Sequence, residues 1–487
     1  MIKPSFSVQR SPHFSVLSED QVYEIHRASL EVLEKAGYRI ESKAAVDLLK
    51  QAGARVNGNI VKTPQHIVEE CLRLAPKGFV LYDRAGNRAL EVEGNKSYFG
   101  SSCASPNTRD ALSGEVHPTT VQDLIRGALI SDALPNIDFI MPMGCPQDVA
   151  AQAADLYEFE AAVTHSQKPI IFIAYSLEGH QMVYEMAAEV AGGLDRLKER
   201  PFIIGYPEPI TPLIYNQETA DKLLYTAGLG MPLVATPASN LGATTPATMA
   251  GTLALLNAES LMGLVLTQLK NPGTPYIMSC FTGVMDMSSG VCSWGAPEFS
   301  LMTAAYGDIA RFYDLPNWGT AGCSDAKTLD QQAAIECTFS CLTQALSGAN
   351  IIHDVGDLDH GMISSAEMLV MGDEVIGMVK HFIQGIEVNA DTIARGIIEK
   401  IGPGGTFLLE DHTYQHFKNE LWFPTLLARQ DYQTWKTEGE ITMEQRIREK
   451  IKEILATHKV PPLPDSTLEA IERIKTEGER QLTRHVT

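Results

Sequence analysis

Residues that could do chemistry stand at the ends of short apolar segments of this sequence. In Asn350-Ile-Ile-His-Asp-Val-Gly, the apolar run ends on His353 and Asp354. A histidine there could hydrogen-bond a carboxylate, act as a general base or ligate a metal ion, with a structural role as an equal alternative. The other candidates are mostly aromatic and include one acid: Phe99, Phe172, Tyr175, Tyr206, Phe281 and Glu208.

These aromatic residues suit a positively charged ligand. The face of an aromatic ring attracts a desolvated ammonium group, and several rings together form the usual receptor for a quaternary nitrogen. A single ring at a strand end could equally fill the core. The prediction of a cation site therefore depends on several rings acting together with Glu208.

The apolar segments themselves indicate how these residues are positioned. Eight of them, marked by Tyr98, Phe139, Ile171, Ile203, Val234, Ile277, Trp318 and Ile351, follow one another at steps of 31 to 43 residues, with a helix-length segment in each interval. This alternation predicts a (β/α)₈ TIM barrel, whose active sites lie at the carboxyl ends of the strands. An open doubly wound sheet is the rival, but the sequence has neither G-x-G-x-x-G nor a P-loop motif.

The barrel is expected to carry an extension at each end. We predict an N-terminal α+β extension over residues 1–95, the barrel over 96–390 and a C-terminal helical extension over 391–487. In the last of these, Ile447, Ile451 and Ile454 form one apolar stripe. The stripe could dock a partner or brace the barrel, and we favour the brace.

Composition excludes several classes of function. The 487 residues carry a net charge of −21, which repels nucleic acid and anionic membrane surfaces. Eight scattered cysteines are typical of reduced thiols, and apolar stretches are broken before about 18 residues. We therefore expect a cytoplasmic protein with no membrane or nucleic-acid partner, and self-association into a homo-oligomer stays open.

Common catalytic arrangements are missing from the strand ends. No pair of histidines spaced i, i+4 occurs there, so no metal site is predicted, and no G-x-S-x-G elbow occurs. We expect no residue to act as acid, base or nucleophile. One enzyme alternative is a TIM-barrel lyase or aldolase that uses Lys327 as a Schiff-base amine.

Several long strings resemble the trimethylamine methyltransferase family, especially its members without pyrrolysine, which include glycine betaine methyltransferases. The strings are Gly283-Val-Met-Asp-Met, Gly295-Ala-Pro-Glu-Phe, Ala321-Gly-Cys-Ser-Asp-Ala-Lys-Thr-Leu-Asp-Gln-Gln-Ala, Glu367-Met-Leu-Val-Met-Gly-Asp-Glu-Val-Ile-Gly-Met-Val and His412-Thr-Tyr-Gln-His-Phe-Lys-Asn-Glu-Leu-Trp-Phe-Pro. The resemblance runs from about Leu17 to at least Trp435. It implies a TIM barrel that passes a methyl group to a cognate corrinoid protein.

The resemblance also suggests roles for residues. Lys327 is expected near the loop that holds pyrrolysine in the trimethylamine branch, and the lack of pyrrolysine here favours a quaternary substrate such as glycine betaine, proline betaine or carnitine. By resemblance to the betaine branch, His353 looks like a contact for the substrate carboxylate. The corrinoid (cobalamin) should arrive on a separate protein, since the sequence lacks D-x-H-x-x-G, and no cofactor is expected to be tightly bound. A non-catalytic betaine-binding protein is the remaining alternative.

Overall fold

The centre of the molecule is a closed ring of parallel strands. In the computed structural model, which describes residues 11–484, each strand pairs with the next and the last returns to the first. Around the ring these are β6 (Tyr98–Ser101), residues 139–140, β9 (Ile170–Phe172), β10 (Ile203–Gly205), β12 (Leu233–Val234), β14 (Tyr276–Ile277), β17 (Trp318–Thr320) and β18 (Ile351–Val355). The predicted (β/α)₈ barrel is confirmed.

Helices cover the outside of the ring in the predicted order. They are α4 (Val121–Ala133), α5 (Ala154–His165), α6 (Leu177–Ala191), α8 (Gln217–Leu229), α9 (Met249–Lys270), α10 (Pro297–Phe312), α11 (Gln331–Ser347) and α12 (Ala366–Ile383), with the short α7 (Leu194–Glu199) after α6. Side-chain caps fix several starts: Thr120 and Asp123 form a capping box on α4, and Ser365 caps α12.

Side chains fill the amino-terminal end of the barrel. Inward-facing residues such as Ile171, Ile204 and Ile277 share one apolar cluster with Leu81 and Val92. The last two belong to a hairpin, β4 (Gly78–Tyr82) and β5 (Arg88–Glu93), joined by a turn over residues 83–87. The hairpin crosses the amino-terminal ends of the strands, so any ligand must enter from the carboxyl ends.

The N-terminal segment lies against one side of the barrel. Its elements are α1 (Glu19–Glu31), the π-helix η1 (Val32–Ala36), β1 (Tyr38–Ile40), α2 (Lys43–Gln51), β2 (Arg55–Asn57), β3 (Ile60–Lys62) and α3 (Gln65–Leu74). β1 pairs with β11 (Ile214–Tyr215), in the loop after β10, and α1 and α3 pack on α9. Their apolar core is continuous with that of the barrel helices, so a domain boundary near residue 95 stays a prediction.

One helix in residues 11–484, α9, is long and apolar enough to cross a membrane by length and composition alone. Within this protein, 72% of its most apolar window is buried. Its neighbours are α1, α2, α3, α8 and α10. All-round hydrophobicity of this kind is what a helix buried between two layers requires.

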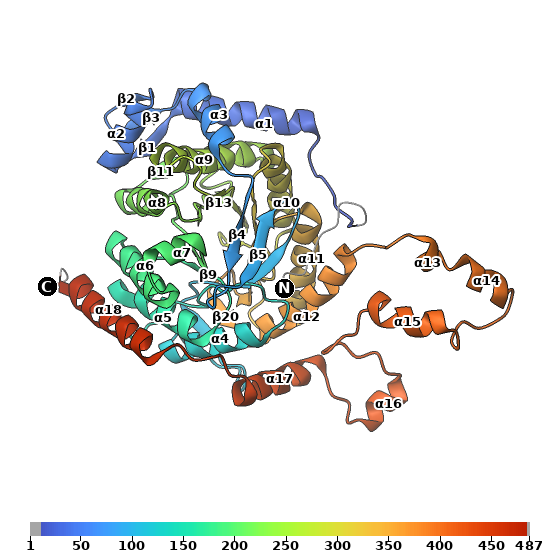
Figure 1. The fold of residues 1–487 in the computed structure, drawn as a ribbon. Helices are drawn as coiled ribbons and strands as arrows, with labels where there is room; N and C mark the ends of the chain where they lie inside the picture. The colour runs from blue at the N-terminus through green and yellow to red at the C-terminus, as the bar shows by residue number, and fades with distance from the viewer. Residues whose placement is uncertain (1–10, 485–487) are drawn as a thin grey trace.

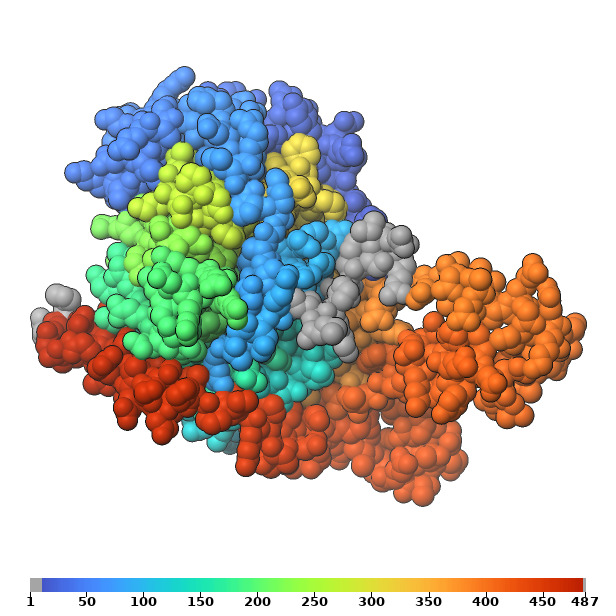
Figure 2. Space-filling view, viewed as in Figure 1, coloured from blue at the N-terminus to red at the C-terminus, as the bar shows by residue number. Residues whose placement is uncertain are grey.

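The C-terminal segment contains a brace and a projecting arm. In α17 (Met443–Thr457), Ile447, Ile451 and Ile454 are buried against α4 and α12, and α18 (Asp465–Thr483) packs along α6. The stripe is therefore a brace. Between α12 and α17, the arm extends away from the barrel and contains α13 (Ala390–Ile393), α14 (Arg395–Ile401), α15 (Asp411–Glu420) and α16 (Tyr432–Thr437) (Figures 1 and 2).

The loops at the carboxyl ends of the strands form two small sheets. One consists of β13 (Ala238–Leu241), β15 (Phe281–Met285) and β16 (Cys292–Ser293), after the fifth and sixth strands. The other joins β7 (Asn107–Arg109) and β8 (Val116–Pro118), after the first strand, to β19 (Asp357–Leu358) and β20 (Ile363–Ser365), after the eighth. These sheets hold the strand-end loops in place around the candidate site.

Candidate active site

Three rings meet inside the barrel near the carboxyl ends of its strands. The His353 ring centroid lies 4.6 Å from that of Trp318 and 6.3 Å from that of Tyr206, and Tyr206 and Trp318 are 5.2 Å apart. All three side chains are at most 3% exposed. They form a floor that closes the barrel below its open end, and we refer to Tyr206, Trp318 and His353 as the ring floor.

Strand register brings the ring floor together. Parallel pairing of β17 with β18 sets Trp318 opposite Ile351 and Thr320 opposite His353, and residues two apart on a strand face the same side. His353 is therefore turned inward above Ile351. Its Nε2 atom lies 3.0 Å from the Thr320 hydroxyl oxygen, which fixes the plane of the imidazole.

Asp354 follows His353 at an irregular point of the strand. The pairing of β18 with β6 shifts register between Ile352 and Val355, and Asp354 has a φ of 76°, in the left-handed region. Bulges of this kind redirect side chains and are common beside active sites. Here the Asp354 Oδ1 atom lies 2.7 Å from His353 Nδ1. The angle at Nδ1 does not suit a hydrogen bond, so the contact is a close approach of charge.

Carboxylates gather around the open end of the barrel. Burial, and then the charges of Asp354, Asp357 and other nearby acids, keep the pKa of the Cys103 thiol well above its ordinary value. Burial also raises the pKa of Glu208, against the opposing effect of its hydrogen bond with Tyr206. Yet the Glu208 side chain is solvent-accessible, and Cys103 is partly so. Glu208 is thus surrounded by protein but reachable by solvent, as expected for a residue that lines a recessed site.

Asp357 adds a second buried acid near Asp354. Burial first, and then the charge of Asp354, raise the pKa of Asp357 well above its ordinary value. The Ser105 hydroxyl donates a hydrogen bond of 2.9 Å to its Oδ1 atom. A raised pKa favours the neutral form of the acid, so Asp357 adds a buried polar group to this end of the barrel rather than a full negative charge.

Two predicted aromatic residues face away from this site. Phe99 packs in the cluster that contains α12, and Phe172 packs edge-on against Phe159 and Tyr184 between β9 and its covering helices. Both are therefore wall residues on the outer side of the barrel strands, with rings turned from the interior. Neither belongs to the set around His353, so a role for them in substrate binding stays a prediction that this packing does not favour.

Two further aromatic residues lie at the carboxyl ends but in other groups. The Tyr175 hydroxyl donates a hydrogen bond of 2.7 Å to Glu158 Oε1 on α5. Burial raises the pKa of Glu158 to about 8. Phe281, on β15, packs edge-on against Trp294 and Phe299, 5.0 and 5.1 Å away between ring centroids. Of the predicted aromatic residues, only Tyr206 belongs to the ring floor.

Lys327 lies on the loop after the seventh strand and is open to solvent. Its side chain is 64% exposed, and Nζ lies 2.7 Å from the backbone oxygen of Asp325 and 3.3 Å from Asp359 Oδ1. A Schiff-base lysine is normally desolvated or placed beside another cation, so that its amine is neutral. The surroundings of Lys327 do not favour the lyase alternative.

Cys103, His353 and Asp354 could together hold a metal ion, because one ligand atom from each lies within 4.8 Å of the others. Two features oppose this. The Cys103 thiol is held protonated by its raised pKa, whereas a metal ion binds the thiolate. His353 already has Thr320 and Asp354 beside its two ring nitrogens. The expectation that the site uses no metal stays a prediction.

Sequence reasoning missed Trp318 and Cys103 as neighbours of His353. Trp318 was recognised only as a strand marker, although it lies two residues before Thr320 on the same face. Its indole Nε1 is buried without a hydrogen-bond partner in the described part of the chain. An unpaired buried donor costs free energy, so it is a candidate contact for a ligand oxygen.

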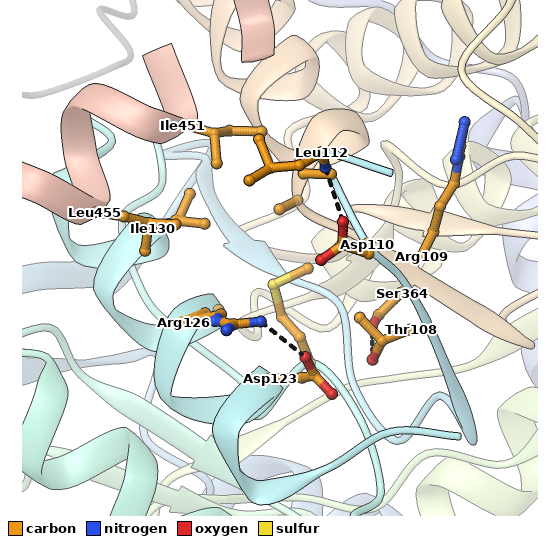
Figure 3. Close-up of a pocket in the computed structure, with 14 residues that line it drawn as sticks. Thr108, Arg109, Asp110, Leu112, Asp123, Arg126, Ile130, Ser364, Ile451 and Leu455 are labelled. Atoms are coloured by element: carbon orange, nitrogen blue, oxygen red, sulfur yellow. Dashed lines mark hydrogen bonds and ion pairs between the residues drawn. The ribbon is translucent and has the colours of Figure 1, made fainter. Parts of the chain in front are cut away.

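A separate hollow of about 170 Å³ lies outside the barrel, where the tail helix α17 meets α4 (Figure 3). Ile130 of α4 and Ile451 and Leu455 of α17 form its apolar side, and Asp123 and Arg126 form an ion pair at its edge. It contains none of the residues predicted to bind substrate. Its walls mark the seam between the brace and the barrel.

The arrangement around the ring floor is suited to binding a cation rather than to acid–base chemistry. Rings and carboxylates converge, and the described carboxylates nearest His353 are engaged with His353, Tyr206 or Ser105. A positively charged group held there would be partly desolvated and would be attracted by the ring faces. Such a site accelerates reactions chiefly by positioning and by excluding water.

Comparisons with known proteins agree with this picture. A family model described as trimethylamine methyltransferase (MTTB) matches residues 3–479. The glycine betaine methyltransferase of Desulfitobacterium hafniense (strain Y51) is 34% identical over 464 residues, which cover 95% of this chain and 96% of that protein. The trimethylamine methyltransferase MttB2 of Methanosarcina mazei is 31% identical over 484 residues, or 98% and 97% of the two chains.

A solved structure supports the fold. The crystal structure of the Methanosarcina barkeri monomethylamine methyltransferase (MtmB) aligns with a TM-score of 0.51 at 13% identity, over 97% of this chain and 89% of that one. At this identity the likeness concerns the fold alone. The sequence matches extend over nearly the whole chain, and they identify it as a methyltransferase that belongs to the trimethylamine methyltransferase family.

Proposed function

We propose that this methyltransferase takes a methyl group from a quaternary amine, glycine betaine or a related betaine such as proline betaine or carnitine, and passes it to the cobalt of a corrinoid carried by a cognate protein. The observation that carries this proposal is the meeting of the ring floor with the carboxylates of Glu208 and Asp354. That combination favours a permanent cation.

The relatives support the choice of substrate class. One is named a glycine betaine methyltransferase and is 34% identical, and others are named trimethylamine methyltransferases at 29–31% identity. The family branch that acts on trimethylamine carries pyrrolysine, and this sequence contains none. We therefore assign the chain to substrates that are already quaternary.

The proposed reaction requires no proton transfer by the protein. When a methyl group leaves a quaternary nitrogen, the other product is a neutral tertiary amine, which needs no proton. Tyr206 and Glu208 would hold the ammonium, and the buried floor would exclude water from one side. In the transition state the positive charge is spread out, so a complete aromatic cage would stabilise the substrate more than the transition state. The few rings present here avoid that.

His353 is proposed to contact the carboxylate of a betaine. Since its Nδ1 faces Asp354, the nitrogen available to substrate is Nε2, which now lies beside the Thr320 hydroxyl. Substrate binding would then exchange the Thr320 contact for one to the carboxylate. The unpaired Nε1 donor of Trp318 would be a second contact to the same group.

A corrinoid, when its carrier protein delivers it, supplies the reduced cobalt that accepts the methyl group. The carrier protein would have to reach the substrate through the open end of the barrel. Glu208, Cys103 and Phe281 belong to three different strand-end segments and are all at least partly accessible from outside. The carboxyl ends are therefore open to a partner's face, whereas the hairpin closes the opposite end.

Methyl transfer can be tested directly. The protein is incubated with a reduced corrinoid protein and, separately, glycine betaine, proline betaine, carnitine and trimethylamine, and methyl–cobalt formation is followed by absorbance. We expect a signal with at least one betaine and none with trimethylamine. Binding of a betaine without methyl transfer would favour a non-catalytic binding protein, and silence with every quaternary amine would refute the proposal.

The role of His353 needs its own comparison. His353→Ala should weaken binding of the betaine substrate more than binding of tetramethylammonium, which has no carboxylate. Equal losses for the two ligands would contradict a carboxylate contact.

Association into a homo-oligomer stays a prediction, supported by large exposed apolar side chains on the arm such as Leu408, Leu409 and Tyr414.

A further inference from the structure

The arm has no apolar core of its own. Its helices α13, α14 and α15 contain no buried residue, and large side chains such as Ile386 and Leu409 are 78% and 88% exposed. Small units that cannot bury a core usually need a disulfide, a metal ion or a partner. The cysteines of the chain all lie between residues 71 and 341, so a disulfide within the arm is excluded.

Three metal-ligating side chains meet at the point where α13 approaches α15. His412 and His416 are four residues apart on α15, which places both on one face of the helix. Their ring centroids are 4.1 Å apart and the planes are tilted by 33°. Both turn toward Asp391 of α13: His416 Nε2 lies 3.2 Å from its Oδ2 atom, and His412 Nε2 lies 3.2 Å from its backbone oxygen.

These distances suit a small divalent ion. Zinc binds imidazole nitrogen and carboxylate oxygen at about 2.0–2.1 Å with tetrahedral geometry, which places ligand atoms about 3.3 Å apart. The 3.2 Å between His416 and Asp391 is already close to that separation. One ligand atom from each of the three residues lies within 4.8 Å of the others.

An ordinary ion pair explains less of this geometry. A single histidine would suffice to pair with Asp391, whereas here two imidazoles are stacked and face the same residue. If both were protonated they would repel each other at this separation, and metal binding requires both to be neutral. The described part of the chain offers a comparison in His458, which pairs with Asp132 at 2.8 Å with no second histidine in the contact.

We propose that Asp391, His412 and His416 bind a zinc-type divalent metal ion that joins α13 to α15 and fixes the shape of the arm. The protein supplies three ligands, and water completes the tetrahedron. This site lies on the arm, outside the barrel that contains the ring floor, so the proposal does not depend on the identity of the methyl donor.

Zinc binding by the full-length protein tests the proposal. After dialysis against a chelator, titration calorimetry with Zn²⁺ alone should show one site that is lost, or weakened at least about tenfold, in both His412→Ala and His416→Ala. His458→Ala is the matched control for a surface histidine paired with an acid, and Cys103→Ser removes the other group that could take the ion. Both controls should keep the site.

Limited proteolysis with trypsin tests whether zinc joins α13 to α15. Zinc should slow tryptic cleavage at Arg395 and Lys400, between the two ligand segments, in the wild-type protein and in His458→Ala but not in His416→Ala. The proposal is overturned if the wild type binds no zinc, if His412→Ala and His416→Ala keep the site, if His458→Ala also loses it, or if bound zinc leaves cleavage unchanged. Circular dichroism checks that each variant is folded.

Discussion

His353 Nδ1 and Asp354 Oδ1 lie 2.7 Å apart, although the two residues are neighbours on one strand and would normally face opposite sides. The contact exists because β18 bulges and Asp354 adopts a left-handed backbone. A strained acid beside a buried histidine at a strand end is the kind of feature that function maintains. It ties the orientation of the imidazole to the negative charge of the site.

Asp354→Asn tests this relationship. The amide keeps the size of the side chain but removes the carboxylate charge, whose Oδ1 atom lies 2.7 Å from His353 Nδ1. We expect methyl transfer to fall about tenfold to a hundredfold, measured as kcat/KM with the best betaine. In the double variant with His353→Ala, the losses should be clearly less than additive, since the two residues act as a unit. Full additivity would show that they act separately.

Trp318→Phe and Trp318→Ala separate packing from recognition. The indole is fully buried between Tyr206 and His353, so truncation to alanine should cost about 3–5 kcal/mol of unfolding free energy. Phenylalanine keeps a ring but has no N–H donor, and should cost much less stability. If the donor contacts the substrate carboxylate, Trp318→Phe should still raise KM for a betaine. An unchanged KM in a stable Trp318→Phe protein would remove that contact from the site.

Much of the fold could be predicted because its signals are local. Each short apolar strand, and the helix-length segment that follows it, is marked by a few neighbouring residues. The barrel then follows from the repetition. What could not be predicted is how the shared apolar core joins the N-terminal segment to α8, α9 and α10, because that depends on contacts distant in sequence.

The site was harder to predict because parallel strands are apolar on both faces. In Ile170-Ile-Phe-Ile, nothing local says which residues face inward, and the structure turns Ile171 inward and Phe172 outward. His353 was found because a histidine in an apolar strand is conspicuous. Its neighbour Trp318 depends on the register between two strands, which the sequence of neither strand reveals.

Glu259 should make stability depend on pH. Burial raises the pKa of this carboxyl to about 8, against hydrogen bonds from the Leu213 backbone N–H and the Thr211 hydroxyl. From the ordinary value of 4.5 up to about 8, the folded protein keeps a proton that the unfolded chain has released. Stability from this group is therefore complete below pH 4.5 and falls by up to about 1.4 kcal/mol per pH unit until about pH 8.

Denaturant unfolding between pH 5 and 9 measures this dependence. Glu259→Gln keeps the shape and an acceptor for Leu213 but cannot ionise, so its stability should decline less steeply than that of the wild type over this range. The two curves should diverge as the pH rises, with the variant the more stable relative to wild type at pH 9. Parallel curves would mean that the Glu259 pKa is not raised in the folded protein.

Glu367 links the brace to the barrel. At the first turn of α12, its fully buried carboxylate lies 2.9 Å from Arg448 Nε on α17 and 3.6 Å from Arg109 Nε after the first strand. Removing Glu367 leaves the largely buried Arg109 without its carboxylate, whereas Arg448 is 32% exposed and keeps its pair with Glu444, so the cost should be below the roughly 3–5 kcal/mol of a fully buried pair. Glu367→Ala should therefore lower the unfolding free energy by about 1–3 kcal/mol and loosen α17, seen as faster amide exchange at Ile447 and Ile451.

Glu444→Ala is the matched control for Glu367→Ala. Glu444 also pairs with Arg448, at 2.8 Å, but its side chain is 50% exposed, and exposed pairs contribute only about 0–1 kcal/mol. Its loss should leave amide exchange in α17 nearly unchanged. If both variants lost the same stability, Arg448 rather than buried Glu367 would be the residue that holds the brace. If neither lost any, the buried isoleucine stripe alone would be sufficient to hold α17 against the barrel.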